Sequence, residues 1–593
     1  MASETVEYRD IDVMFADFLC RRAGESGETL RRVALDVSRA TGDGHICLDL
    51  AEAYGSSEAE TAASLAKSAV VAGPGRVAPL VLDGDNRIYL YRYWKYEQDL
   101  AAWLRAMAGE RVGGVDLGLM RDGLHRLFEP RTGDGPDWQK IAAAAALRSR
   151  FTVVSGGPGT GKTTTVVKIL ALLMEQSKGA RLSIALAAPT GKAAARLRES
   201  IRTAREKLRE KSGVADRIPD DVSTIHRLLG VIPGSCRFRH DADNPLPHDI
   251  VVVDEASMVA LPLMARLVAA LSSHARLILL GDRDQLASVE PGAVLGDICR
   301  GGHESGFSRE FLSFLDEVTG AGPAHDAEGK GMSPLADSIV VLRKNYRFGA
   351  SSAIGVISRA VNEGDAGAVL AALAGREDGE VVRKDVPPAE SLSTALEESV
   401  LGGYAEYLGT EDPAGALALF DRFRILCAVR RGSHGVSGVN RAVESILASR
   451  RLIASDRTWY RGRPVMVTVN DYTVRLFNGD IGIALPDPDR PETLSVFFPA
   501  ENGGVRKVSP LRLPDHETVF AMTVHKSQGS EFDRVLLVMP PADSRVLTRE
   551  LLYTGITRAR KSVEIWCGEE ILRATVSRCI DRRSGLERAL WEE

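Results

Sequence analysis

The chain has 593 residues and a mass of 64.0 kDa, which is too long for one hydrophobic core, so several domains are expected. Hydrophobic residues make up 44% and charged residues 26%, an ordinary globular composition that excludes fibrous and disordered classes. The formal net charge is −5, so nucleic acid would need a local basic groove, because the chain as a whole does not attract polyanions.

The chain shows no targeting or membrane signal. Its start lacks a basic segment followed by an apolar run, and it has no stretch of about 18 apolar residues. Its seven cysteines are scattered singly, without a C-x-x-C pair for zinc or redox chemistry. We therefore expect a cytoplasmic protein with reduced cysteines and no membrane association.

Residues 1–115 carry no obvious site chemistry and are interpreted as a mixed, largely helical N-terminal domain. An aromatic-rich stretch at 87–104 has the alternation of a strand. Its aromatics, Trp94 among them, are expected in a sheet core or on a partner surface, with base stacking as the alternative. We predict that residues 1–115 are a docking domain for other subunits.

Residues 156–163 read GGPGTGKT, between an apolar strand at 151–154 and a helix at 164–174. Glycines let successive backbone N–H groups converge on a phosphate at the positive end of the following helix. Lys162 adds a mobile charge, and the Thr163 hydroxyl can bind Mg²⁺. The pattern predicts a nucleoside triphosphate site, against the alternative of a chance Gly-rich turn. The expected nucleotide-binding residues of this loop are Gly157, Pro158, Gly159, Thr160, Gly161, Lys162, Thr163 and Thr164.

Two segments between this loop and residue 250 permit more than one interpretation. The basic stretch 192–211 contains interleaved glutamates, which favour a solvated helix over a phosphate-binding face. The segment 236–249 contains His240, Asp241, Asp243 and His248, a composition that allows a metal cluster, although we do not favour one.

Two carboxylates, Asp254 and Glu255, directly follow the apolar run IVVV. At the carboxyl end of a parallel strand they would lie beside the phosphate loop, where Asp254 can hold Mg²⁺ and Glu255 can orient or deprotonate the attacking water. The alternative is that the pair caps a helix. Gln285 follows the next strand and is expected in the same crevice, where its amide could sense the γ-phosphate.

The pattern of strands predicts an α/β fold in two halves. The runs FTVV, LSIALAA, DIVVVDE and RLILLGD alternate with helical segments, which indicates a parallel sheet in a first domain at 116–350. A Gly- and Pro-rich run at 301–334 predicts a loop or linker. The runs FRILCAV, VFAMTVHKS, RVLLVMP and SVEIWCG predict a second parallel sheet at 351–593, with an inserted small β-barrel at about 458–514.

Eight phrases in order resemble superfamily 1 helicases, and the RecD group among them: GGPGTGKT, APTGKAA, TIHRLLG, VVVDEASM, LLGDRDQL, LRKNYRF, TVHKSQGSEF and LLYTGITRAR. N-terminal phrases such as GDGHICLDL extend the resemblance to nearly the whole chain. The resemblance implies two RecA-like P-loop NTPase domains and an SH3-like barrel. It also implies an ATP-dependent 5′-to-3′ single-stranded DNA translocase and helicase, the motor of a RecBCD-type nuclease complex in double-strand break repair and recombination. Its partners would be single-stranded and duplex-end DNA and RecB-like and RecC-like subunits, in a heterotrimer.

The resemblance also assigns residues. Gln139 would read adenine, Glu531 would lie near the ribose, and ATP with Mg²⁺ would be the cofactors. The residues expected to act in hydrolysis are Lys162, Glu255, Gln285, Arg347 and Arg558, the two arginines reaching the triphosphate across a cleft. Those expected to grip the DNA backbone are Thr190, Lys192, His226, Thr523, His525 and Ser527, with core or capping roles as the alternative for the two histidines.

The resemblance further interprets residues 231–248 as a hairpin used as a pin to split the duplex. The free-standing RecD-like helicase and a nucleotide-binding regulatory subunit without productive turnover remain as alternative functions. The second is disfavoured by five intact residues: Lys162, Asp254, Glu255, Gln285 and Arg558. The chain has no nuclease constellation of carboxylates outside the ATP site, so DNA cleavage is expected in a partner subunit.

Overall fold

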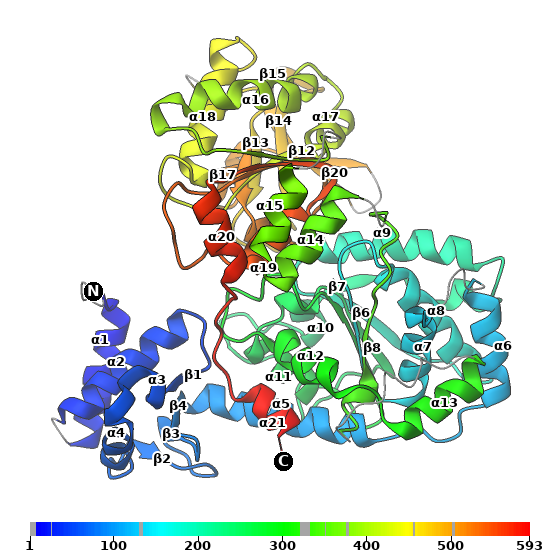
Figure 1. Ribbon diagram of the computed structural model, residues 1–593. Helices are drawn as coiled ribbons and strands as arrows, with labels where there is room; N and C mark the ends of the chain where they lie inside the picture. Colours follow the sequence, from blue (N-terminus) through cyan, green and yellow to red (C-terminus); the bar gives the residue numbers. More distant parts are fainter. Residues whose placement is uncertain are drawn as a thin grey trace.

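A computed structural model describes most of the chain and gives four sheets, two of them parallel (Figure 1). The described residues are 7–24, 27–129, 135–320, 333–349, 352–374, 379–454, 457–500 and 504–592. The parallel sheets with crossover helices confirm the predicted α/β class. Within the described ranges, each helix is too short or too polar to cross a bilayer.

The first module is a small α+β unit with a core of its own. Its sheet has the strand order β1-β4-β3-β2, and helix α2 buries Leu30, Val33 and Val37 at helical spacing against it. The elements of the module are α1 (Asp10–Ala23), α2 (Glu28–Gly42), β1 (Cys47–Asp49), α3 (Leu50–Tyr54), α4 (Glu58–Leu65), β2 (Val71–Ala72), β3 (Leu80–Leu82) and β4 (Arg87–Leu90).

The aromatic-rich stretch is mostly a helix, so the expectation of a strand at 87–104 is wrong beyond Leu90. Helix α5 (Tyr91–Gly109) buries Leu100, Leu104 and Ala108, whose spacing of four residues places them on one helical face. Trp94 is half-buried and packs against the same core as these residues, the core on one face of the first parallel sheet. Tertiary packing of this face has overridden the β preference of the aromatics.

The first parallel sheet has the order β10-β5-β9-β8-β6-β7. Successive residues of each strand point to opposite faces, so Val251 and Val253 enter one core while Val252 enters the other. Both faces are covered by helices, as a parallel sheet requires. The strands are β5 (Phe151–Ser155), β6 (Ile184–Ala188), β7 (Val222–Thr224), β8 (Ile250–Val253), β9 (Arg276–Gly281) and β10 (Ile339–Val341).

Helices from distant parts of the chain cover this sheet. One face carries α6 (Leu117–Leu127), α7 (Trp138–Arg148), α8 (Lys162–Gln176), α9 (Gly191–Leu208) and α13 (Arg309–Thr319). The other face carries α5, α10 (Ile225–Leu229), α11 (Leu261–Ala269), α12 (Val294–Ser305) and α21 (Leu586–Trp591). The first sheet is therefore completed by segments from both ends of the chain.

The Gly- and Pro-rich run is less loop-like than expected. Within residues 301–334 the structure places the end of α12 and the whole of α13, whose Phe311, Leu315 and Val318 are buried. Helical spacing of these three apolar residues explains the helix. The remaining part of the predicted linker, 321–332, lies outside the described residues.

The second parallel sheet has the order β11-β20-β19-β12-β18, which includes the four predicted strands and adds β11 at an edge. Its strands are β11 (Val381–Lys384), β12 (Phe423–Cys427), β18 (Ala521–Thr523), β19 (Phe532–Val538) and β20 (Ala559–Trp566). Its helices are α14 (Ala353–Glu363), α15 (Ala366–Ala374), α16 (Leu392–Leu408), α17 (Pro413–Phe420), α18 (Val436–Ser449), α19 (Arg549–Ile556) and α20 (Glu569–Ser577). Figure 1 shows this half above the first parallel sheet.

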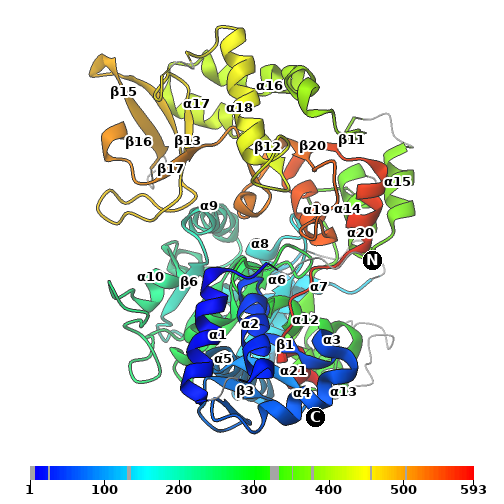
Figure 2. The ribbon, with the colours of Figure 1, turned by 90° about the vertical axis from the view of Figure 1, so that its left-hand side faces the viewer.

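The insertion between β12 and β18 is a five-stranded antiparallel sheet. One of its faces contributes Met466, Ile483 and Phe497 to the core of the second half, and the other forms a small core around Val467 and Phe498. Its strands are β13 (Pro464–Val467), β14 (Ile481–Asp487), β15 (Arg490–Pro499), β16 (Val505–Val508) and β17 (His516–Thr518). Figure 2 shows this sheet at the outer side of the second half.

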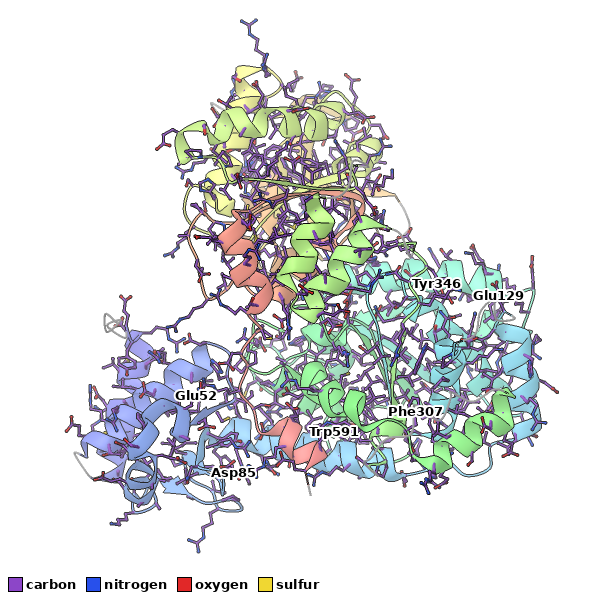
Figure 3. All side chains as sticks on the ribbon, viewed as in Figure 1. Glu52, Asp85, Glu129, Phe307, Tyr346 and Trp591 are labelled. Atoms are coloured by element: carbon purple, nitrogen blue, oxygen red, sulfur yellow. The ribbon has the colours of Figure 1, made fainter. Side chains whose placement is uncertain are left out.

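The last residues return to the first half as an ordered segment, which we call the C-terminal strap (residues 578–592). It leaves α20, runs past the N-terminal module and ends in α21 against α5 and α12 (Figure 1). The Ile46 N–H donates to the Arg583 carbonyl at 2.7 Å, and Arg583 also pairs with Glu52. Arg588 pairs with Asp85 at 2.6 Å, and the Trp591 ring packs on Gly301 (Figure 3).

Candidate functional site

The glycine-rich loop joins β5 to α8, as the sequence predicts, although α8 begins at Lys162 rather than at 164. Gly159 and Gly161 have φ of +84° and +81°, a backbone conformation that favours glycine. The Lys162 ammonium donates to the carbonyls of Gly156 at 2.6 Å and Gly157 at 3.2 Å. The loop therefore already holds its cation at the amino end of α8, where an anion is stabilised.

The two predicted carboxylates follow β8 at the same edge of the sheet. Burial and the neighbouring Glu255 raise the pKa of Asp254 to about 6, while Lys162 lowers it, which places these groups close to the loop. Glu255 adopts φ +51°, an uncommon conformation for a residue other than glycine. Its N–H donates to Asp254 at 2.8 Å. Strained backbone of this kind is concentrated at functional sites.

Gln285 follows β9, the strand that pairs with β8, and is buried at 5% exposure. Its Nε2 donates to Asp282 at 3.1 Å, and the same carboxylate oxygen of Asp282 accepts a hydrogen bond from Tyr553 at 2.9 Å. Tyr553 belongs to α19 of the second half. The sequence analysis did not identify Asp282 or Tyr553, because nothing local to either residue indicates a contact across the two halves.

The segment 345–347 lies over the glycine loop. Asn345 donates to the Pro158 carbonyl at 2.8 Å, and the Tyr346 N–H donates to the Gly159 carbonyl at 2.8 Å. The Tyr346 side chain is 59% exposed beside Gly161 (Figure 3). Gln139 Nε2 contacts the Thr160 carbonyl at 3.3 Å, so the predicted adenine-reading amide adjoins the loop.

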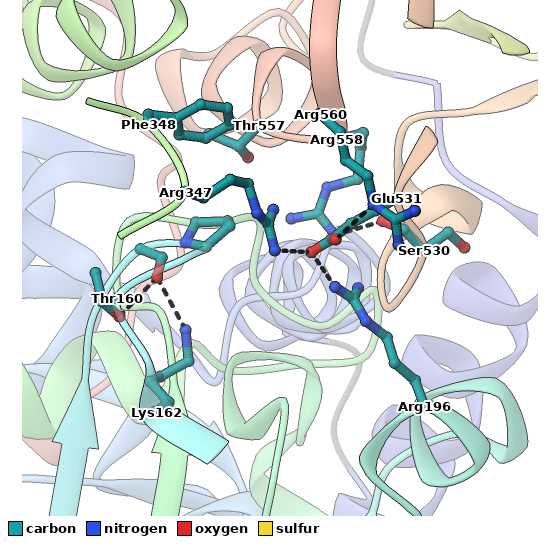
Figure 4. A network of polar contacts seen from close by, with 12 residues as sticks. Thr160, Lys162, Arg196, Arg347, Phe348, Ser530, Glu531, Thr557, Arg558 and Arg560 are labelled. Carbon is teal, nitrogen blue, oxygen red and sulfur yellow. Dashed lines mark hydrogen bonds and ion pairs between the residues drawn. The ribbon is translucent and has the colours of Figure 1, made fainter. Parts of the chain in front are cut away.

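Glu531 is the centre of a charged network between the two halves (Figure 4). Its side chain is 5% exposed and pairs with Arg196 of α9, with Arg347 at 2.7 Å and with Arg560 of β20 at 3.3 Å. Although burial opposes it, Arg196 and Arg347 lower the pKa of Glu531 to about 2. Sequence analysis placed Glu531 near a ribose, and no ligand is present to test that assignment.

Arg558 is 1% exposed and contacts the backbone just before Glu531. Its Nε donates to the Thr554 carbonyl at 3.1 Å and its Nη1 to the Ser530 carbonyl at 3.2 Å. Burial lowers its pKa, while the negative charge of Glu255 raises it. The sequence-predicted Arg347 and Arg558 therefore both lie at the boundary between the phosphate loop and the second parallel sheet.

Three predicted DNA-binding residues lie on the first half. Thr190 caps α9 by accepting from the Ala193 N–H at 3.2 Å, and Lys192 follows it in the first turn. Burial lowers the pKa of the half-buried Lys192 to about 8. His226 on α10 is exposed, and its ring lies 5.8 Å from that of Phe238.

The other three lie beside β18 of the second half. Thr523 is buried, and its hydroxyl accepts from the Lys526 N–H at 3.3 Å. His525 is half-buried, and burial lowers its pKa. Ser527 is fully buried and donates to the Val524 carbonyl at 2.6 Å, so its hydroxyl faces the protein here. The close contact of Gly529 with Ala193 brings this segment to the start of α9.

Within the segment predicted as a hairpin, 231–248, Val231 and Phe238 form an isolated antiparallel bridge, and the structure gives no strand among these described residues. The described residues contain no group of three or more His, Cys, Asp or Glu side chains arranged to hold a metal ion. His248 instead contacts Ser183 at 2.9 Å, and His240 contacts the Asn244 carbonyl at 3.2 Å.

Arg196 is a further charged residue that the sequence analysis missed. It was included in a solvated helix, and α9 is indeed a helix. The exposed Arg202 on this helix pairs with Asp220 outside it at 3.2 Å. Arg196 pairs with Glu531, a contact that only the folded arrangement reveals.

Comparison with known families agrees with this geometry. Residues 139–291 match a family described as AAA domain, residues 518–565 match the UvrD-like helicase C-terminal domain, and residues 5–61 match the N-terminal domain of RecBCD enzyme subunit RecD. RecBCD enzyme subunit RecD from Mycobacterium tuberculosis is 42% identical, with 98% of this chain and 94% of the relative covered.

A more distant relative and a solved structure complete the comparison. RecBCD enzyme subunit RecD from Haemophilus influenzae is 36% identical, with 87% of this chain and 82% of the relative covered. A crystal structure of Bacteroides Pif1 bound to single-stranded DNA is 16% identical with a TM-score of 0.38, and covers 74% of this chain and 94% of that one.

Proposed function

The chain belongs to the family of RecBCD enzyme subunit RecD, and we propose that it is the ATP-driven DNA helicase motor of a RecBCD-type complex in recombination and double-strand break repair. One observation carries the proposal: a phosphate loop on the first parallel sheet lies under the segment of Arg347, which pairs with Glu531 of the second half, where Arg558 is also buried. Arginines in that position stabilise the charge that spreads over a phosphoryl group during transfer. Nucleotide-dependent closing of this boundary would move bound DNA.

The nucleotide is ATP with Mg²⁺ in this proposal. Two buried atoms, Arg347 Nη1 and Gln285 Oε1, have no hydrogen-bond partner among the described residues. Unpaired buried polar atoms are unfavourable, and a phosphate oxygen and a water would satisfy them. Asp254 and Thr163 supply the oxygen ligands that Mg²⁺ prefers, and the ion, when bound, would neutralise charge on the β- and γ-phosphates.

Hydrolysis would be carried by the residues at the carboxyl ends of β8 and β9. Glu255 accepts the proton of the attacking water, and Gln285 orients that water. Asp282, which also accepts from Tyr553, holds the Gln285 side chain. Lys162 and the two arginines stabilise the developing charge. Gln139 beside the loop favours adenine over guanine, and Glu531 would approach the ribose.

DNA would cross the two halves where α9 meets the segment after β18. Thr190, Lys192 and His226 on one side, and Thr523, His525 and Ser527 on the other, would grip the backbone without reading sequence. Ser527 would first have to exchange its hydrogen bond to Val524. The 5′-to-3′ direction and the pin role of the hairpin at 231–248 are carried over from the family.

We assign four structural units. The docking domain ends near residue 90, not 115, because α5 packs on the first parallel sheet. The first RecA-like domain then runs to about residue 350, with the hairpin inside it. The second runs from there to α20, before the C-terminal strap returns to the first, and carries an inserted SH3-like barrel that extends to β17, a few residues beyond 514.

The docking surface for the RecB-like and RecC-like subunits of a heterotrimer is assigned to α1. Ile11, Met14 and Phe18 are 61%, 66% and 52% exposed and recur at helical spacing on one face. An exposed apolar stripe of this kind is typical of protein interfaces. Trp94, which the sequence placed among possible interface residues, packs instead toward the first core.

The decisive experiment measures ATP hydrolysis by the purified chain with and without single-stranded DNA, and unwinding of duplexes with a 5′ or a 3′ tail. We expect stimulation by the strand and unwinding from the 5′ tail only. Absence of strand-stimulated hydrolysis would contradict the motor assignment. Co-purification with partners is the parallel test: the double change Met14→Asp and Phe18→Asp should abolish assembly and spare hydrolysis, whereas the control Arg31→Ala should affect neither.

A further inference from the structure

Arg196 links α9 to the nucleotide side of the molecule. It lies six residues after the helix cap Thr190, and its guanidinium pairs with Glu531 on the second half. The pKa of Arg196 is raised: burial opposes the shift, but Glu531 and then Glu255 and Asp254 outweigh it, so all three carboxylates act on this side chain. Arg196 therefore lies between the DNA-binding start of α9 and the acids of the ATP site.

Glu531 is shared by arginines with different access to solvent. Arg196 and Arg347 both contact its Oε1, with 32% and 24% of their side chains exposed. Arg560 contacts Oε2 at 3.3 Å and is 53% exposed, so its attraction is weakened by solvent. Three cations surround one carboxylate, which leaves a surplus of positive charge for an incoming anion (Figure 4).

Arg347 has two competing partners once a triphosphate binds. Its Nη2 is held by Glu531, while its Nη1 is buried and has no hydrogen-bond partner in the part of the chain that the structure describes. Its backbone is fixed above the loop, because Asn345 bonds to Pro158 and also accepts the Arg347 N–H at 2.9 Å. The side chain can therefore turn toward a γ-phosphate while its Cα stays in place.

We propose that Arg196 is a positioning residue that keeps Glu531 neutralised while Arg347 leaves it for the γ-phosphate. A carboxylate that is 5% exposed is strongly destabilised when its partner is removed. With Arg196 in place, the departure of Arg347 leaves Glu531 paired on the same oxygen. Arg196 belongs to α9, whose first turn carries residues proposed to bind DNA. Its ion pair with Glu531 therefore couples DNA binding at that end of the helix to the triphosphate-bound state. This inference rests on the proposed function and concerns the regulation of the same site.

The test is a double-mutant cycle in the full-length chain, with Arg196→Gln, Glu531→Gln and both together. The probes are a non-hydrolysable ATP analogue and ADP, each with Mg²⁺ and a saturating oligo-dT strand. Arg196→Gln should weaken binding of the triphosphate analogue on the order of tenfold to a hundredfold, and binding of ADP by less than about threefold. The double variant should recover most of that loss, because a neutral amide at position 531 needs no counter-ion.

The controls separate positioning from a general structural role. Arg202→Gln, on the same helix and paired with Asp220 outside the site, should leave both affinities unchanged. Arg196→Lys keeps the charge with fewer donors and should lie between wild type and Arg196→Gln, which preserves the test if the glutamine variant melts early.

Two outcomes would overturn the inference: additive effects in the cycle, or equal losses for the triphosphate analogue and ADP. Failure of the proposed function looks different, because then the wild-type chain would show no strand-stimulated hydrolysis at all. The binding cycle itself needs no turnover, so it still decides the role of Arg196.

Discussion

Two polar regions join the second half of the molecule to the rest, and they shift the pKa values of buried carboxylates in opposite directions. In the cleft, three arginines surround Glu531 and lower its pKa to about 2 against the effect of burial. At the C-terminal strap, burial raises the pKa of Asp297 and of Glu97 to about 7, opposed by a hydrogen bond from Ser584 and one from the Gly585 N–H.

The difference lies in the partners, since all three carboxylates are withdrawn from water. Guanidinium groups compensate the desolvation of a carboxylate, whereas a single hydroxyl or amide does not. The cleft therefore gathers three arginines around one carboxylate and keeps a buried donor, Arg347 Nη1, available for a phosphate. At the C-terminal strap, the raised pKa values leave the two carboxyl groups partly uncharged near neutral pH. Variants in the cleft should change hydrolysis, and variants in the strap should change stability.

Lys162→Ala should give the largest effect. The loop loses its cation at the β- and γ-phosphates, so hydrolysis should fall by about 10³-fold or more. A coupled-enzyme ATPase assay with single-stranded DNA measures it, alongside a thermal melt to confirm folding. Near-wild-type turnover in a folded variant would refute the assignment of this loop.

Glu255→Gln should come next, with a loss of about 10²- to 10³-fold in turnover and little change in ATP affinity. The amide cannot accept the proton of the attacking water, but it keeps the size of the side chain. Equilibrium binding of labelled ATP under conditions without turnover checks the second part. If binding disappears with hydrolysis, Glu255 has a structural role.

Arg558→Ala should lower turnover by about 10²-fold and also lower the melting temperature. The guanidinium is fully buried and holds the Thr554 and Ser530 carbonyls, so its removal leaves buried acceptors unpaired. Lys561→Ala is the matched control on β20: that side chain is 71% exposed and pairs with Asp533, so neither quantity should change. Comparable losses in both variants would remove the special role of Arg558.

The strap should give the smallest effect, visible only in the pH dependence of stability. The pKa of Asp297 is raised from 3.8 to about 7, so the folded state binds a proton more tightly than the unfolded state. The contribution of Asp297 to the stability of the folded state is fully present below pH 3.8 and is lost as the pH rises to about 7. Asp297→Asn should therefore melt higher than wild type at pH 8, by roughly 1 to 3 °C, with the gap closing toward pH 5.

Subtracting the melting temperature of wild type from that of the variant isolates the effect of Asp297 from the effects of neighbouring groups. His45 accepts a hydrogen bond from the Arg583 N–H, and burial lowers its pKa. Its contribution to stability therefore has the opposite pH dependence and is lost as the pH falls below the usual pKa of histidine. It is present in both proteins and cancels. A melting difference that stays constant from pH 5 to 8 would show that Asp297 does not titrate in this range, and ATP hydrolysis should be equal in both.

Local patterns predicted the loop and the strand ends well. The strand, the glycines and Lys162 lie within a dozen residues, so propensity and periodicity act together there. The same reasoning failed at residues 87–104, where alternating aromatics indicated a strand but Leu100, Leu104 and Ala108 pack as a helix under the first sheet. At 309–319 the flanking glycines and prolines led to the prediction of a loop, whereas the segment is a helix.

The sequence by itself determined the α/β class, the phosphate loop and the chemical types of the residues around it, because these depend on neighbours in the chain. Only the tertiary structure decided that Arg196 reaches Glu531, that Tyr553 reaches Asp282, and that the C-terminal strap completes the first domain. Each of these joins residues more than 200 positions apart. No local pattern encodes such pairs, since they are chosen by which surfaces remain to be covered once the helices and strands have formed.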